Sequence, residues 1–121
     1  MNYLKETHSI TIPEAIGLNE PEFSDNSLQV FEQFFDSKHS FYIVALEAVS
    51  VTTKSVAIAL ALFDGIITLQ QAVDCSRIED NLQAAEFGKV EGIHDVNDCY
   101  ELMVLAAAKN IVNLTGSGFR L

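Results

Sequence analysis

The sequence predicts an all-α protein, a compact bundle of about five helices that follows an irregular N-terminal segment. Both prolines, Pro13 and Pro21, lie near the start of the chain. Proline disrupts the interior of a helix, and none occurs after residue 21. The later glycines fall between segments of helical length, where they are typical of helix ends. No segment clearly predicts a β-strand, and we therefore expect no sheet.

The pattern of the chain changes after its first quarter. Residues 1–26 are expected to be irregular, with one short turn of helix after Pro13. Residues 27–121 are expected to form one helical domain. With 49% hydrophobic residues in a chain of 121, one well-packed core is possible without disulfides or metals.

Three helices are predicted in the first half of this domain, over residues 27–36, 40–54 and 56–63. The first carries apolar side chains at helical spacing, namely Leu28, Phe31, Phe34 and Phe35. The third segment is apolar throughout, so its periodicity fits a buried strand as well as a buried helix. Its three alanines favour a helix, which Asp64 and Gly65 should end.

Two further helices are predicted in the second half. Thr68 and Gln71 have the spacing of a capping box, and the helix that they open should continue without a break to Gly88. Asp95 is then expected to cap a last helix that ends near Leu114.

The charge balance restricts the kind of partner. The chain has 17 acidic and 7 basic residues, a formal net charge of -10. Such a surface repels nucleic-acid phosphates and anionic lipids, so neither is an expected partner, and a protein with a basic or mixed surface suits it better. The two cysteines, Cys75 and Cys99, imply no disulfide framework.

One apolar run raises the question of membrane insertion. Residues 41–67 are rich in hydrophobic side chains, but Glu47, Lys54 and Asp64 interrupt them. Charged side chains are costly in lipid, so this run is expected to form core and not a membrane span. Residues 1–6 have neither the apolar stretch of a signal peptide nor the pattern of an intact mitochondrial presequence.

Some charged residues fall on the apolar sides of the predicted helices. On a helical wheel, Glu79 and Glu86 lie within the apolar arc of their helix, and Glu47 lies on the apolar side of its own, with Lys54 on the same face. A buried charge without a partner is very costly, so these positions need an explanation.

Two interpretations remain open. In the first, an internal polar network stabilises the fold, and Glu47 and Glu79 are mostly buried, with Arg77 or Lys54 as the partner of at least one. The members of this expected network are Glu47, Lys54, Arg77, Glu79 and His94. In the second, Glu79 and Glu86 face a groove in which a partner protein docks.

The sequence offers little to support an enzyme. Glu91 and His94 have the spacing of one half of a di-iron motif, but such sites need two copies and two further glutamates. His94 and Asp95 are adjacent on a turn, and no serine or cysteine nucleophile sits in a recognisable elbow. We therefore expect no catalytic residue, no metal and no cofactor.

An ordered set of short strings resembles a known family. The likeness covers residues 41–111, and order and spacing together make it specific. The strings are Ala45-Leu46-Glu47, Lys54-Ser55, Ala59-Leu60-Ala61-Leu62, Ala72, Ser76-Arg77-Ile78-Glu79 with Gln83, Gly88-Lys89-Val90-Glu91, His94-Asp95 and Ala106-Ala107-Ala108. They resemble the ATP synthase mitochondrial F1 complex assembly factor 2 family, chaperones of the F1 α subunit.

The resemblance implies a helical, non-enzymatic protein of the mitochondrial matrix that binds the newly imported F1 α subunit and prevents its aggregation. The family's functionally sensitive glutamate maps to Glu91, and we expect Glu86 and Asp95 to share its partner surface. Family members commonly have tryptophan where this chain has Phe87, and they carry an N-terminal β-rich domain that residues 1–40 do not resemble. The alternative is therefore a stable structural subunit of ATP synthase, or of another large mitochondrial complex, that retained only the helical domain.

Overall fold

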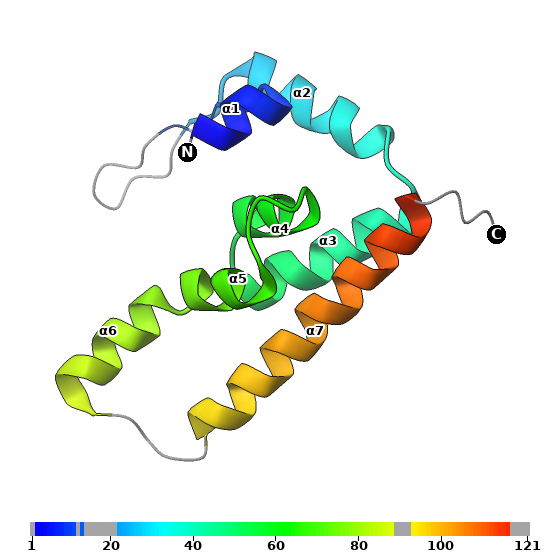
Figure 1. Ribbon diagram of the computed structural model, residues 1–121. Coiled ribbons are helices and arrows are strands. Elements are labelled where there is room, and N and C mark those ends of the chain that lie inside the picture. The colour runs from blue at the N-terminus through cyan, green and yellow to red at the C-terminus, as the bar shows by residue number, and fades with distance from the viewer. Residues whose placement is uncertain (1, 12, 14–21, 89–92, 117–121) are drawn as a thin grey trace. The chain divides into compact units, whose positions relative to one another are not determined.

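The computed structural model describes residues 2–11, 13, 22–88 and 93–116, and within them the chain forms seven α-helices and no strand (Figure 1). The all-α prediction is confirmed for this part of the chain, whereas the expected number of about five helices is too low. In chain order the helices are α1 (Asn2–His8), α2 (Asp25–Asp36), α3 (Ser40–Thr53), α4 (Val56–Phe63), α5 (Leu69–Ser76), α6 (Ile78–Phe87) and α7 (Ile93–Gly116).

The chain divides into two compact units, Met1–Lys38 and His39–Leu121. The first contains α1 and α2, and the second contains α3 to α7. The boundary between the units follows α2.

The first unit contains a helix, α1, where the sequence predicted irregular chain. The helix ends at His8, and Ser9 follows it with a left-handed φ of 57°. The N–H of Ile10 then donates to the carbonyl oxygen of Leu4 at 3.1 Å, and both Leu4 and Ile10 are buried. A helix this short shows too little periodicity to be predicted, because it depends on packing for its stability. The short turn expected after Pro13 lies outside the described residues.

The predicted helix over residues 27–36 is confirmed as α2, which begins slightly earlier. Its N-cap is Ser24, whose hydroxyl accepts a hydrogen bond from the N–H of Ser27 at 3.3 Å. Within the same unit, the ring of Phe34 meets the ring of His8 edge-on, with 5.1 Å between centroids. Aromatic contacts of this kind link α2 to α1.

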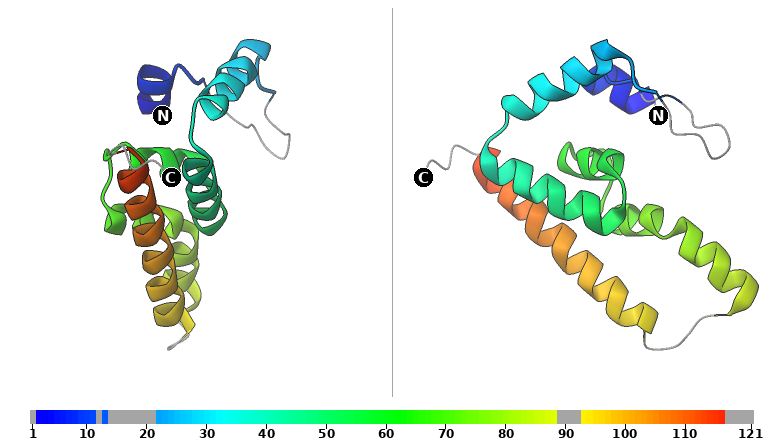
Figure 2. Two further views of the ribbon diagram at one scale, coloured as in Figure 1. Left: turned by 90° about the vertical axis from the view of Figure 1, so that its right-hand side faces the viewer. Right: turned by 180° about the vertical axis from the view of Figure 1, so that it is seen from behind.

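Four helices of the second unit supply its buried core. α3 and α7 run antiparallel and side by side, and the views in Figures 1 and 2 agree on this arrangement. α4 and α5 pack against this pair. The buried hydrophobic side chains are Ala45, Leu46 and Val49 of α3, Ala59, Leu60, Ala61 and Leu62 of α4, Ala72 and Val73 of α5, and Leu105 and Ala108 of α7. The alanines allow close helix approach, and the leucines fill the remaining space.

The apolar run over residues 41–67 forms two short helices and not one long one. α3 ends at Lys54, and α4 begins after Ser55, whose hydroxyl accepts a hydrogen bond from the N–H of Ile58 at 3.3 Å. The ambiguous segment 56–63 is thus a helix, as its alanines predicted. In the described part of the chain, no helix is long and apolar enough to cross a membrane.

The capping box is confirmed, but the helix that it opens is shorter than predicted. Thr68 and Gln71 make both of the reciprocal hydrogen bonds, at 3.2 and 2.9 Å. At Arg77 the backbone leaves the helical region, with φ -107° and ψ 12°, and the predicted single helix becomes α5 and α6. α6 ends at Gly88 as predicted, at a φ of 90° that favours glycine.

The last helix begins earlier than predicted. α7 starts at Ile93, so Asp95 lies inside its first turn, and the prediction that Asp95 is the N-cap is wrong. An aspartate is also favourable inside the first turn, where it faces the positive end of the helix dipole, so its presence did not fix the boundary. The side chains of His94 and Asp95 lie outside the described residues. The end of the helix agrees closely with the prediction.

Replacing Lys54 by glycine should stabilise the protein by about 0.5–1 kcal/mol, measured by urea unfolding. Lys54 caps the C-terminus of α3 in the left-handed conformation, with φ 56° and ψ 24°. This conformation is sterically unfavourable for a residue with a Cβ atom, whereas glycine adopts it without strain. Lys54→Ala keeps the Cβ and should unfold close to wild type. A loss of stability in both variants would instead assign the side chain a structural ion pair.

Alkaline titration should show a tyrosine component at unusually high pH, which belongs to Tyr42. Burial, and to a lesser extent the Asp64 carboxylate, raise the pKa of Tyr42 to about 12 from the ordinary value of 10.0. The folded state therefore binds the Tyr42 proton more tightly than the unfolded state does. The resulting contribution to stability is complete below pH 10 and is lost as the pH rises toward 12. Tyrosinate absorbance should lose its highest-pH component in Tyr42→Phe. A high-pH component that persists in Tyr42→Phe would contradict this assignment.

Candidate partner-binding site

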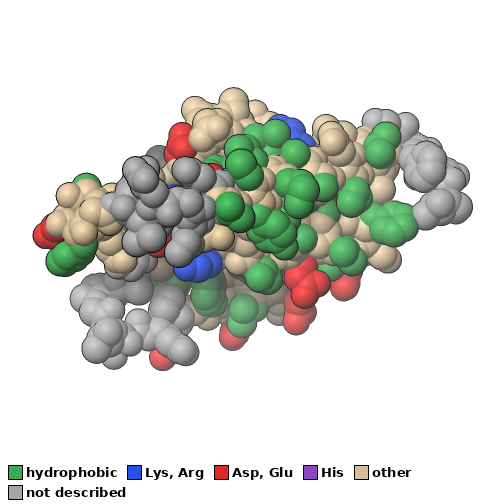
Figure 3. All heavy atoms as spheres, turned by 90° about the horizontal axis from the view of Figure 1, so that it is seen from below, with side chains coloured by type: hydrophobic (Ala, Val, Ile, Leu, Met, Phe, Trp, Pro, Cys, Tyr) green, Lys and Arg blue, Asp and Glu red, His purple; other side chains and the backbone are tan. Residues whose placement is uncertain are grey.

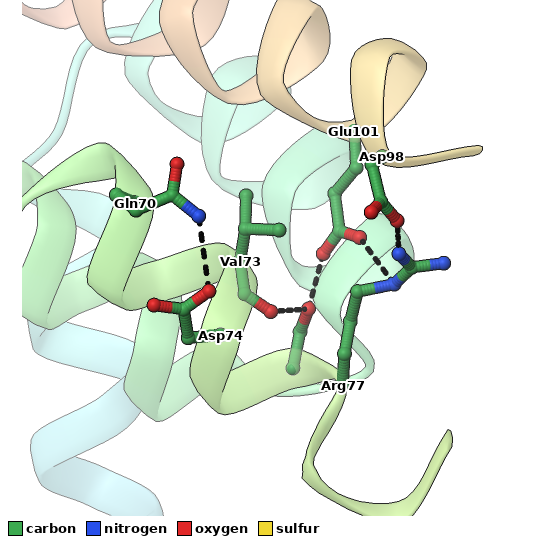
Figure 4. Close-up of polar contacts among 7 residues, drawn as sticks. Gln70, Val73, Asp74, Arg77, Asp98 and Glu101 are labelled. Carbon is green, nitrogen blue, oxygen red and sulfur yellow. Dashed lines mark hydrogen bonds and ion pairs between the residues drawn. The ribbon is translucent and has the colours of Figure 1, made fainter. Parts of the chain in front are cut away.

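A cluster of charges connects the break between α5 and α6 to α7 (Figure 4). Arg77, the residue at the break, points its guanidinium group at two carboxylates of α7, those of Asp98 and Glu101. The guanidinium pairs directly with Asp98, and its Nε lies 3.5 Å from Oε2 of Glu101. One arginine thus binds two acidic residues one helical turn apart on the facing helix.

Burial makes this cluster structurally important. Glu101 is only 7% exposed, and the side chain of Arg77 is 12% exposed. The Ser76 hydroxyl lies within hydrogen-bonding distance of both Oε1 of Glu101 and the carbonyl oxygen of Val73, the latter at 2.8 Å. Because the hydroxyl has one proton, it donates to one of these acceptors at a time. Each buried charge of the cluster therefore has a partner, which is the condition for its presence in the core.

Sequence reasoning singled out Arg77 but missed both of its carboxylate partners. A signal for Glu101 was available, because Glu101, Leu105 and Ala108 follow one another at helical spacing on α7 and are all buried. The helical wheel that placed charges on the apolar sides of the earlier helices would also have placed Glu101 on the apolar side of α7.

The structure does not bring Glu47 and Lys54 into this cluster. Both are exposed, so the prediction that Glu47 is mostly buried is wrong. The buried stripe of α3 contains Leu46 and Val49, and Glu47 lies on the other side of the helix. The wheel misassigned it because α3 is apolar on nearly all sides, so its pattern did not show which side packs. The side chains of Glu79 and His94 lie outside the described residues.

An open groove runs between the exposed sides of α3 and α7, with a volume of about 440 Å³. We call it the α3–α7 groove, and its lining residues are Val44, Glu47, Ala48, Val51, Thr52, Tyr100 and Val104. Three of the large side chains are strongly exposed, Val51 at 73%, Val44 at 61% and Tyr100 at 60%. On the face shown in Figure 3, hydrophobic side chains gather along the middle of the surface. Exposed apolar surface of this kind is typical of a binding site.

α6 adds a second exposed apolar surface. None of its described side chains is buried, and Ile78, Leu82 and Phe87 are all exposed, Phe87 at 84%. Gln70 and Asp74, on the preceding helix, hydrogen-bond to each other at 2.9 Å on the solvent side (Figure 4). The outer side of α5 is thus polar, whereas α6 presents large apolar side chains to solvent.

The three residues expected at a partner surface are only partly placed. Glu86 is exposed on α6, beside the exposed Phe87. Asp95 lies in the first turn of α7, and its side chain is outside the described residues, as is the whole of Glu91. The described residues therefore show one of the three at an exposed apolar surface and leave the other two untested.

No protein-family model matches the chain. Among solved structures, its fold resembles that of Atp12 from Paracoccus denitrificans, with a TM-score of 0.82 and 19% sequence identity. A structure of a point variant of the same protein matches equally well. The match covers 94% of this chain and 48% of the solved chain, so this chain spans about half of the protein that it resembles. The chain thus shares the fold of about half of Atp12, in agreement with the resemblance drawn from the sequence.

Replacing Arg77 by leucine should destabilise the protein by about 3 kcal/mol in urea unfolding, because Glu101 would stay buried without its cationic partner. The double variant Arg77→Leu, Glu101→Leu should recover much of this loss, since it removes both charges from the core. Glu86→Leu, which changes an exposed glutamate, should unfold within about 0.5 kcal/mol of wild type. A single Arg77→Leu variant as stable as wild type would show that the cluster contributes nothing to stability.

Proposed function

We propose that this chain is a binding domain that shields the F1 α subunit during the assembly of ATP synthase. The observation that carries the proposal is the fold. Nearly the whole of this chain shares its fold with about half of the F1 assembly factor Atp12. The sequence strings that resemble the same family provide separate support, because their order and spacing are a property of the sequence and not of the fold. The proposed role is binding and not catalysis.

The surface of the second unit suits such a role. An unassembled subunit exposes apolar surface that its neighbours cover in the finished complex, so a protein that shields it needs apolar surface of its own. Val44, Val51 and Tyr100 at the α3–α7 groove, with Leu82 and Phe87 on α6, supply that surface. The net charge of -10 keeps the chain apart from copies of itself and favours a partner with basic groups.

We further propose that Glu91, Glu86 and Asp95 act at the partner surface, as the family resemblance implies. Glu86 supports this by its exposure beside Phe87, since a charge at the rim of an apolar patch directs binding without weakening the core. We assign the protein to the mitochondrial matrix on the same resemblance. The solved match is a bacterial protein and adds nothing to that assignment.

Charge reversal at Glu91 should abolish binding of the α subunit without unfolding the chain. The expected readout is a pull-down of refolded α subunit by wild-type chain that is lost with Glu91→Lys, while circular dichroism and melting stay close to wild type. The physical reason is that the carboxylate would pair with a basic side chain of the α subunit, and a lysine would repel it.

The matched control is Glu32→Lys, which makes the same change of charge at an exposed position of α2 in the other unit. It should retain the α subunit. Failure of the wild-type chain to retain the α subunit at all would contradict the proposed function. Presence of the chain in purified ATP synthase at fixed stoichiometry would instead identify a structural subunit, since a chaperone leaves before assembly is complete.

A further inference from the structure

The α3–α7 groove contains an acidic residue in an unusual setting. Glu47 is the only charged side chain among the described residues that line it, and its neighbours along α3 are Val44, Ala48 and Val51. Within the described part of the chain, Glu47 makes no ion pair and no hydrogen bond. The carboxylate is exposed to solvent, and an apolar segment that fills the groove would remove water from it. A lysine or arginine on the occupant would compensate this loss most fully, because charge-assisted hydrogen bonds are the strongest that a carboxylate makes.

The shape of the groove fits a helix. Its walls are two antiparallel helices, with Val44, Ala48 and Val51 one turn apart on α3 and Tyr100 and Val104 one turn apart on α7. From residue 44 to residue 52 the wall extends roughly 12 Å, about two helical turns. A third helix laid along this pair would bury side chains at positions i, i+3 or i+4, and i+7, as in other helix-in-groove complexes.

From this arrangement we infer that the α3–α7 groove binds an amphipathic helix of a partner protein that carries a lysine or arginine within its apolar stripe, with Glu47 as the counter-ion. The apolar lining supplies the contact area, and Glu47 selects the helix that has a basic residue at the matching position. The inference rests on the proposed function in one respect, namely that the helix belongs to the F1 α subunit.

Charge argues against a second copy of this chain as the occupant. Two copies that met through this groove would bring together two proteins that each have a net charge of -10, with the Glu47 carboxylates on the same shared interface. Among the residues that line the groove there is no basic side chain to compensate. A basic helix from a different protein satisfies the same apolar surface without this repulsion.

The test uses two labelled helical peptides of identical composition and net charge. In the first, one lysine lies in the middle of a leucine stripe and a glutamine lies on the polar side. In the second, these two residues are exchanged. Fluorescence anisotropy with the full chain should show about fivefold to tenfold tighter binding of the first peptide, because only its lysine reaches Glu47. Glu47→Lys should abolish or reverse this preference, and Glu32→Lys should leave it unchanged.

Several results would overturn the inference. They are equal binding of the two peptides to the wild-type chain, an unchanged preference in Glu47→Lys, or a wild-type dimer in analytical ultracentrifugation that Glu47→Lys dissociates. A pull-down of the α subunit with the same variants separates this inference from the proposed function. Retention of the α subunit by Glu47→Lys but not by Glu91→Lys would refute the groove and keep the function. A clear peptide preference without any retention of the α subunit would support the groove and refute the function.

Discussion

The pairing of Arg77 with Asp98 and Glu101 fixes the relation between the middle of the chain and its last helix. Arg77 stands where α5 ends and α6 begins, and both carboxylates belong to α7. The guanidinium group and the Glu101 carboxylate can share a nearly dry environment only when their positions are closely matched, since each would be costly alone, whereas the Asp98 side chain is 44% exposed. The backbone break between α5 and α6 lies at Arg77 itself, so the residue that leaves the helical conformation is also the one that contacts α7. The direction in which α6 leaves the core is set at the same residue.

The alanine-rich core complements this ionic constraint. Small side chains at Ala45, Ala59, Ala61, Ala72 and Ala108 allow the helices of the second unit to approach one another closely. Packing on one side of α3 and α7 leaves large apolar side chains on their other sides, where Val51 and Tyr100 are strongly exposed. These exposed apolar side chains belong to the surface that we propose for binding.

A binding surface of this kind agrees with the fold's likeness to Atp12. Shielding a subunit before assembly requires apolar contact that can later be given up, which favours open grooves over deep pockets. The α3–α7 groove and α6 are both open, and acidic side chains accompany each of them, Glu47 in the groove and Glu86 on α6. Acidic groups among apolar contacts lend selectivity for basic partners, and they discourage self-association of a chain with so much exposed apolar surface.

The sequence by itself determined the helical class, the helices α2, α3 and α4, the capping box at Thr68 and the end of α6 at Gly88, because each depends on neighbours a few residues away. It also named Arg77 as a candidate partner for a buried carboxylate, and it pointed to the family whose fold the chain shares. Only the tertiary structure decided which carboxylates Arg77 meets, since Glu101 is far from it in sequence and adjacent in space. The tertiary structure also showed that Glu47, which was expected to be buried, lies in an open groove. α3 is apolar on almost every side, so packing against α4, α5 and α7, and not periodicity, determines which side is buried.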